Sequence, residues 1–192
     1  MSPAFIKGSK ENFPKAKITF DKFHVMKIVN KAVDQVRREE QFNNPNDLLK
    51  KTRYIWLKNP NNLTEKQKES FASLSKMNLK TLRAYNLKLA FQEFWDIDDI
   101  TTAASYLQKW YSWAIRSQLE PMIEVAHFID RHWQGIIHYI QSRINNGILE
   151  GLNSIVQTIK RKARGFRNVN NFITAIYLKC GKLEFDLPKA FI

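Results

Sequence analysis

Apolar residues recur at helical spacing along most of this chain, and the pattern predicts a protein built mainly from helices. Proline is favoured in the first turn of a helix and stops a helix elsewhere, so Pro3 and Pro14 delimit a short predicted helix. After Asp21, the segment KFHVMKIVNKAVDQVRREE predicts a long helix with one apolar face. That face is formed by Val25, Val29, Ala32, Val33 and Val36, and the other side carries His24, Lys27, Lys31 and Arg38.

The middle of the chain predicts a helical bundle. Residues 43–47 (NNPND) break the first pattern, and the following TRYIWL is compatible with either a strand or a helix. Thr64 and Gln67 form a helix-capping signal, and from there to about Ser142 helical spacing continues almost without interruption. Tryptophans at helical spacing are typical of a bundle core. Those in this region are Trp95, Trp110, Trp113 and Trp133.

The last part of the chain predicts two more helices. The sequence INNG at 144–147 breaks the pattern, and Asn145 or Asn146 is a natural N-cap for the next helix. We expect that helix to run to about Arg164 and to end at Gly165, with NVNNFITAIYLKC forming the final one.

One short segment predicts a β-strand. KAKITF lies between the first two predicted helices and directly precedes Asp21. The order strand, acid, helix is the one in which open α/β sheets place functional groups, just beyond the carboxyl end of a strand. The expected fold is therefore mainly α with a small β component.

The charge of the chain narrows the classes of partner. The 192 residues carry a formal net charge of +13, which attracts nucleic acid, anionic membranes or acidic proteins. No stretch resembles a transmembrane helix, and the start lacks the apolar segment of a secretion signal. The lone Cys180 excludes an internal disulfide and a Cys-rich zinc site. We expect a cytoplasmic protein without membrane contact that binds a polyanion.

The positive charge is concentrated near the carboxyl end. From Gly151 to Leu183 there is no Asp or Glu, against seven Lys and Arg residues. The candidate residues for binding a phosphate-bearing polyanion in this stretch are Lys160, Arg161, Lys162, Arg164 and Arg167. The alternative interpretation is an ordinary solvated charge run. Concentration of cations on one helix and its exit loop favours a surface that faces phosphates.

Glu150 is the one acid at the start of this basic helix. Projection at 100° per residue places it on the polar face with Gln157, Arg161 and Arg164, opposite an apolar face that includes Ile155. A bare carboxylate there would repel a phosphodiester backbone, whereas a divalent cation such as Mg²⁺ would bridge it to phosphate oxygens. The alternative is a structural acid in the first helical turn, stabilised by the helix dipole.

Asp21 is the second candidate ligand, and His24 lies three residues after it, where a neutral imidazole could bond a carboxylate or phosphate. The alternative for Asp21 is a helix N-cap. The acidic group EFWDIDD (93–99) is interpreted as a cap for the helix at Ile100. The remaining histidines, at 127, 132 and 138, lack metal-ligand spacing and are interpreted as core or surface residues.

Three stretches together resemble the DDE transposases of the bacterial insertion-sequence L-three family. They are KITFDKFHVMKIVNKAVDQVRREE, YIWLKNPNNLTEKQ and NNGILEGLNSIVQTIKRKARGFRN, and the match covers nearly the whole chain. The resemblance implies a ribonuclease-H-like α/β core interrupted by a helical insertion, and cutting and joining of insertion-element DNA with Mg²⁺ or Mn²⁺. It implies that Glu150 is the last acid of the catalytic triad, and that Asp21 and His24 match a D-x-x-H motif. Glu150 and Asp21 are then the candidate metal ligands.

The chain departs from that family in what precedes Asp21. The family's first acid lies far upstream, and its second directly precedes a stretch like Met1-Ser2-Pro3. We expect its amino-terminal zinc-binding and helix-turn-helix regions to be missing as well. We therefore expect a carboxy-terminal part of a transposase with an incomplete catalytic core.

The resemblance also predicts how the chain is divided. Residues 1–42 are expected to be a core remnant, 43–143 a helical insertion, 144–183 returning core helices and 184–192 a tail. Expected partners are element ends and target DNA, with a homo-oligomer or a full-length transposase, in the nucleoid of the cytoplasm. Two alternatives are a non-catalytic DNA-binding or regulatory fragment and a helical protein-interaction module.

Overall fold

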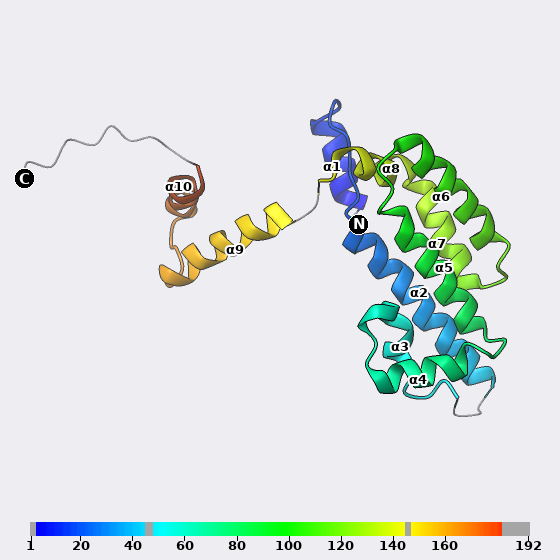
Figure 1. The fold of residues 1–192 in the computed structure, drawn as a ribbon. Helices are drawn as coiled ribbons and strands as arrows, with labels where there is room; N and C mark the ends of the chain where they lie inside the picture. Colours follow the sequence, from blue (N-terminus) through cyan, green and yellow to red (C-terminus); the bar gives the residue numbers. More distant parts are fainter. Residues whose placement is uncertain (1–2, 45–47, 145–146, 182–192) are drawn as a thin grey trace, which may run out of the picture. The chain divides into compact units, whose positions relative to one another are not determined.

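The computed structural model describes residues 3–44, 48–144 and 147–181, and all regular elements within these ranges are helical (Figure 1). The chain divides into two compact units, Met1–Ile144 and Asn145–Ile192, and each is described by itself. The helices of the first unit are α1 (Pro3–Asn12), α2 (Lys22–Asn43), α3 (Arg53–Leu57), a 3-10 turn (Pro60–Asn62), α4 (Glu65–Leu74), α5 (Lys80–Phe94), α6 (Ile100–Ile115), α7 (Glu120–Arg131) and α8 (Trp133–Ser142). Those of the second unit are α9 (Gly147–Lys162) and α10 (Val169–Cys180).

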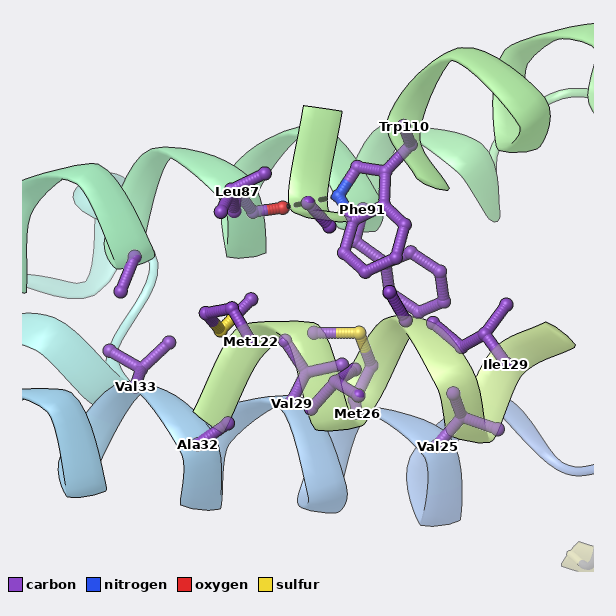
Figure 2. Packing of buried hydrophobic residues seen from close by; sticks show 14 of the residues in the cluster. Val25, Met26, Val29, Ala32, Val33, Leu87, Phe91, Trp110, Met122 and Ile129 are labelled. Atoms are coloured by element: carbon purple, nitrogen blue, oxygen red, sulfur yellow. Dashed lines mark hydrogen bonds between the residues drawn. The ribbon is translucent and has the colours of Figure 1, made fainter. Parts of the chain in front are cut away.

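The long helix α2 forms one wall of the core in the first unit. Its predicted apolar stripe is confirmed, because Val25, Val29 and Val33 are fully buried. Figure 2 shows this stripe facing residues of α5 and α7, with Met122 and Ile129 on α7. The side chains of α2, α5, α6 and α7 therefore fill one common apolar interior.

Aromatic side chains fill the other part of this core. The Phe91 ring lies 4.7 Å from that of Trp110, whose indole donates to the Leu87 carbonyl at 2.8 Å (Figure 2). Trp95 and Trp110 are buried as predicted, but Trp113 is 45% exposed and does not belong to the core. Trp56, which the helical pattern did not single out, is fully buried.

Several predicted helix ends are confirmed by their hydrogen bonds. Thr64 and Gln67 form a reciprocal capping box at the start of α4. The Asp99 carboxylate accepts from the Thr102 amide at 2.7 Å and so caps α6. The segment TRYIWL, which was compatible with two structures, forms the short helix α3. The proposed N-caps Asn145 and Asn146 lie outside the described residues.

The predicted β component is wrong. Residues 16–21 form no strand, and the described parts of the chain contain no sheet. A strand is stable only when its backbone pairs with another extended segment. Here the Phe20 amide instead donates to the carbonyl of Gly135 in α8 at 3.1 Å, and Thr19 Oγ1 lies 2.5 Å from His138 Nδ1. The expected ribonuclease-H-like α/β core is therefore not what these residues form, and the fold described is all-α.

The second unit is a pair of helices joined by a tight turn. Arg164 and Gly165 both have positive φ, at 50° and 97°, and the Gly165 amide bonds the Lys160 carbonyl at 2.9 Å. This left-handed turn confirms Gly165 as the residue that terminates the helix, whose last helical residue is Lys162. The rings of Phe166 and Phe172 lie 5.0 Å apart across the turn. Asn168 then caps α10 by accepting from the Asn170 amide at 2.8 Å.

Within the ranges described, no helix combines the length and the apolar character needed to cross a membrane.

The division of the chain into a core remnant, a helical insertion and returning core helices, with boundaries after residues 42 and 143, remains a prediction. In the structure, α2 packs with α5 and α7 inside one unit.

Candidate nucleic-acid interface

The candidate DNA-binding residues surround the carboxyl end of α9. Lys160, Arg161 and Lys162 form its last turn, while Arg164 and Arg167 lie in the turn that leads to α10, and all five are exposed. Cations are favoured at this position because they interact with the negative end of the helix dipole. Between Gly151 and Gly181 the sequence has no acid to neutralise them. The result is a compact basic surface on the second unit.

The cations do not all share one side of the helix. Glu150, Gln157 and Arg161 are seven and four residues apart along α9, so they lie on one exposed face. The Arg161 Nε donates to the Gln157 carbonyl at 3.4 Å, which directs the side chain along this face. Lys162 instead lines a groove between the helices together with Lys179. The basic surface therefore wraps around the end of α9.

The groove between α9 and α10 has a volume of about 610 Å³ and an apolar floor. Ile155, Ile159 and Phe166 contribute to that floor, and the ammonium-bearing side chains of Lys162 and Lys179 also line the groove. The apolar face predicted for α9 is thus partly used for packing against α10. The side chain of Ile148, also predicted for that face, lies outside the described residues.

Asp21 and His24 come together at the start of α2. The Asp21 Oδ1 accepts from the Phe23 amide at 2.8 Å and the His24 amide at 3.3 Å, as an N-cap does. His24 Nδ1 lies 3.4 Å from the same oxygen, and its side chain is 46% exposed. The structure thus shows the capping role that was the alternative for Asp21, with the imidazole beside it.

The described residues do not form a ready-made metal site. In no part of the chain that the structure describes do three His, Cys, Asp or Glu side chains gather as ligands. Mg²⁺ requires oxygen ligands in near-octahedral geometry, and Asp21 Oδ1 already accepts from two backbone amides and has His24 Nδ1 3.4 Å away. Glu150 is exposed in the first turn of α9, in the other unit. No chemical step through a metal is derived from these donors.

The acids 96–99 that the sequence singled out have structural partners, whereas His127 is exposed. Hydrogen bonds from Thr102 lower the pKa of Asp99 below its usual value. Asp98 pairs with Arg143 at 2.5 Å, and Asp96 with Lys22 at 3.5 Å. Their interpretation as a helix cap and its surroundings is confirmed.

His132 packs between aromatic rings. Its ring lies 4.8 Å from Phe20 and 4.7 Å from Phe128, and burial lowers its pKa. This environment favours the neutral imidazole and matches the predicted structural role.

Comparison with known proteins decides the family. Residues 1–176 match the family model of the ISL3 type described as Transposase. The chain belongs to this transposase family. It is 26% identical to the transposase for insertion sequence element IS1001 of Bordetella parapertussis, over 92% of this chain and 45% of the relative. It is 30% identical to the transposase for insertion sequence element IS1557 of Mycobacterium tuberculosis, over 73% of this chain and 31% of the relative.

This transposase-family chain therefore spans less than half the length of the curated relatives it matches. No solved structure matches it.

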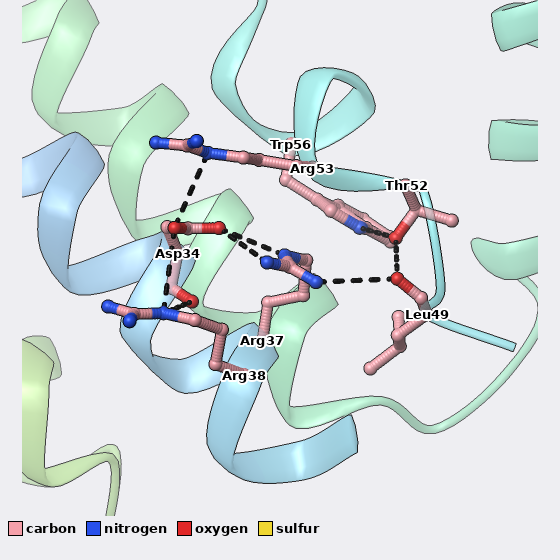
Figure 3. A network of polar contacts seen from close by, with 7 residues as sticks. All are labelled: Asp34, Arg37, Arg38, Leu49, Thr52, Arg53 and Trp56. Atoms are coloured by element: carbon pink, nitrogen blue, oxygen red, sulfur yellow. Dashed lines mark hydrogen bonds and ion pairs between the residues drawn. The ribbon is translucent and has the colours of Figure 1, made fainter. Parts of the chain in front are cut away.

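Sequence reasoning missed one polar cluster in the first unit of this transposase-family chain. Asp34 is contacted by Arg37 and Arg38 of its own helix and by Arg53 of α3 (Figure 3). The spacing of Asp34, Arg37 and Arg38 at three and four residues was a visible signal for part of it. The contribution of Arg53 depends on how α3 packs and had no local signal.

Proposed function

We propose that this chain supplies a DNA-binding part of an insertion-sequence transposase, and that the basic surface at the end of α9 contacts the DNA backbone. Membership of the transposase family and the five exposed cations at one helix end support this proposal. The observation that carries it is their concentration in a segment without acids, from Gly151 to Gly181. The partners proposed are element ends and target DNA, with further copies of the transposase, in the bacterial nucleoid.

The proposed contact has a measurable electrostatic signature. Each cation that neutralises a phosphate releases bound counterions, so the slope of log K against log salt changes by about 0.9 per contact. Five contacts predict a slope of about −4.5 from this surface alone. Arginine adds a planar fork that bonds two phosphate oxygens, so Arg161, Arg164 and Arg167 are expected to contribute most.

For strand cleavage and transfer we propose Glu150, Asp21 and His24 as the participating residues of this chain. A bound Mg²⁺ or Mn²⁺ would supply stabilisation of the attacking and leaving oxygens. Glu150 is the stronger candidate ligand, because its side chain is exposed on the face that carries Arg161. Asp21 already holds the start of α2, so ligation would compete with its capping hydrogen bonds.

The DNA-binding proposal is tested by fluorescence anisotropy with labelled duplex DNA over a range of salt concentrations. Replacing Arg161, Arg164 and Arg167 by alanine is expected to reduce the salt slope by about 2.7, at 0.9 per contact, with a clear loss of affinity. The matched control replaces Lys66, Lys76 and Lys109, which are exposed cations of the first unit. Equal effects of the two triple variants, or no binding at low salt, would contradict the proposal. The second outcome would favour the protein-interaction module.

The catalytic proposal is tested separately by incubating element-end DNA with Mg²⁺ and following cleavage and strand transfer. Cleavage that disappears in Glu150→Gln, while DNA binding persists, supports a role of Glu150 in chemistry. DNA binding without cleavage by the wild-type chain supports the alternative, a non-catalytic or regulatory transposase fragment.

A further inference from the structure

Three arginines converge on one carboxylate in the first unit, and they do not bind it in the same way (Figure 3). Arg37 donates to Asp34 Oδ1 from both Nε and Nη2, at 3.0 and 2.8 Å, and both side chains are only 12% exposed. Arg38 and Arg53 approach Oδ2 through their Nε atoms, at 3.6 and 3.4 Å. The short hydrogen bonds to the Asp34 carboxylate therefore come from Arg37. Arg38 and Arg53 form longer ion pairs with it, which orient their side chains.

Hydrogen bonds between α2 and the segment that begins α3 fix the position of Arg53 relative to Arg38. Arg37 Nη1 donates to the Leu49 carbonyl at 3.4 Å, and the same carbonyl accepts from Thr52 Oγ1 at 2.7 Å. Thr52 Oγ1 in turn accepts from the indole of the buried Trp56 at 3.0 Å. Arg53 follows Thr52 directly, so this chain of hydrogen bonds fixes its helix relative to Arg38 (Figure 3).

The outward side of the cluster is positively charged and open. The side chains of Arg38 and Arg53 are 62% and 55% exposed, and three guanidinium groups around one carboxylate leave two positive charges in excess. Figure 3 shows the guanidinium groups of Arg53 and Arg38 above and below the Asp34 carboxylate, with their terminal amino groups directed toward the left of the view and away from Arg37. Within the described ranges, these terminal groups have no hydrogen-bond acceptor in the protein. Two such forks can share one anion with several oxygens.

We propose that Arg38 and Arg53 form a clamp for a backbone phosphate of DNA, as a second contact separate from the basic surface of α9. This inference rests on the proposed function, since it assumes that the chain binds DNA. Asp34 is the positioning residue of the clamp, because it holds the two Nε atoms while the Nη atoms face outward.

The surroundings of the clamp fit a DNA strand. Lys27 and Lys31 are exposed and lie on the same face of α2 as Arg38, so the cationic stripe is about 16 Å long at 1.5 Å per residue. One strand of B-DNA places about five phosphates over that length, at 3.4 Å each. Tyr54 is 61% exposed beside Arg53, whose guanidinium lies 5.9 Å from its ring, and an exposed ring of this kind can stack on a sugar or base.

The clamp is tested by the salt dependence of DNA binding by the full chain. Arg38→Ala with Arg53→Ala is expected to weaken binding at least tenfold and to reduce the salt slope by about 1.8, for two phosphate contacts at 0.9 each. The matched control is Lys109→Ala with Arg116→Ala, two exposed cations of α6 and its C-cap whose side chains make no hydrogen bond or ion pair among the described residues. Behaviour equal to this control would overturn the inference.

A second pair of measurements keeps the test independent of folding defects. Arg38→Lys with Arg53→Lys keeps both charges, so the salt slope should be retained while affinity falls severalfold, because lysine lacks the fork. Hydrogen exchange of the wild-type chain should slow at residues 34–38 and 52–57 when duplex DNA is added. If the wild-type chain binds DNA without slower exchange at these residues, the clamp is wrong. The clamp is also wrong if an acidic peptide slows exchange at these residues and DNA does not.

Failure of this inference is distinguishable from failure of the proposed function. If the wild-type chain binds DNA and only the Arg161, Arg164 and Arg167 variant loses affinity, the clamp is wrong and the proposed function stands. If the wild-type chain shows no DNA affinity at low salt, both are wrong.

Discussion

Lys88 is a fully buried cation whose three donors are all used. Its Nζ donates to the carbonyls of Trp56, Leu57 and Lys58, at 3.0, 2.8 and 3.2 Å, and so caps the carboxyl end of α3. A short helix of this kind has little stability of its own. The ammonium therefore connects α5 to α3, and burial lowers its pKa to about 8.

The lowered pKa of Lys88 predicts a pH dependence of stability. In the unfolded chain the group titrates near 10.5, so between pH 8 and 10 the folded state binds fewer protons than the unfolded state. The free energy of unfolding should therefore rise with pH in this window, by at most about 1.4 kcal/mol per unit relative to Lys88→Met. Urea denaturation of both proteins at pH 7, 8, 9 and 10 measures it. A constant difference between them would contradict the prediction.

Asp34 and Arg37 predict opposite outcomes for single and double substitution. Asp34→Ala leaves a largely buried guanidinium without its carboxylate, and removal of one partner of such a pair costs about 3–5 kcal/mol. Replacing both, as Asp34→Leu with Arg37→Leu, removes both charges and should cost less than the single change. Chemical denaturation of the three proteins checks this order. A double variant less stable than Asp34→Ala would contradict this prediction. It would show that the ion pair itself stabilises the fold, and that the two groups do more than neutralise each other's charge.

At the scale of elements, α5 begins with a cap supplied by another helix. Its N-cap position, Leu79, has no side chain able to accept a hydrogen bond. Instead the buried Glu40 of α2 accepts from the amides of Lys80 and Thr81, at 2.8 and 2.7 Å, and from the Thr81 hydroxyl at 2.7 Å. A carboxylate suits this place because the helix dipole is positive at its amino end.

We expect Glu40→Gln to lower the free energy of unfolding by about 1–3 kcal/mol, because an NH2 group would replace one of the two accepting oxygens and face at least one of the three donors. Glu39→Gln is the matched control: this neighbouring residue is exposed and bonds only the Gln35 amide among the described contacts. Thermal unfolding followed by circular dichroism compares the two. Equal melting temperatures would show that the cap is dispensable.

Gly135 lies where α8 packs against the segment 16–20, and this close contact predicts that a larger residue at position 135 lowers stability. A Cβ at this position would lie 2.5 Å from a Phe20 ring carbon and 2.9 Å from the Ile18 carbonyl oxygen. The carbonyl belongs to the backbone, so the segment itself would have to move. Gly135→Ala should cost about 1–3 kcal/mol, although alanine favours helices elsewhere. A neutral or stabilising effect in urea denaturation would mean that the segment is loosely attached.

The elements show which parts of the fold could be predicted from the sequence. The stripe of α2 and the caps at Thr64 and Asp99 were predictable because their signals lie within a few residues. The strand prediction failed because pairing depends on a partner segment, which local pattern does not contain. The bonds from Glu40 to Thr81 and from Lys88 to α3 span 41 and about 30 residues, and no local signal announces them.

The same distinction applies to the candidate site. The basic residues around Arg161 are exposed as their sequence predicted, because a charged helix end needs no packing to be formed. The pairing of Arg53 with Asp34 was missed, since it requires α3 to pack on α2. Participation of Glu150, Asp21 and His24 in catalysis stays a prediction.

At the scale of the whole molecule, the two units differ in what holds them together. The first contains a continuous apolar core, whereas no described side chain of α9 or α10 is buried. Leu152 and Ile155 of α9 are 41% and 40% exposed, and Ile173 and Tyr177 of α10 are 44% and 63% exposed. Helices of this length gain most of their stability from packing, so the second unit should be much less stable than the first.

Native-state hydrogen exchange tests this difference in the full chain. Amides of α2, α5 and α7 should exchange only through global unfolding, which for a domain of this kind costs about 5–15 kcal/mol. Amides of α9 and α10 should exchange through local unfolding that costs a small fraction of that free energy, because little buried apolar surface is exposed when these helices unfold. Equally slow exchange in both units would contradict this prediction, because it would mean that α9 and α10 are as stable as the first unit although their side chains are exposed.

Added DNA should slow exchange around Arg161, because a ligand that binds only the folded helices stabilises them by mass action.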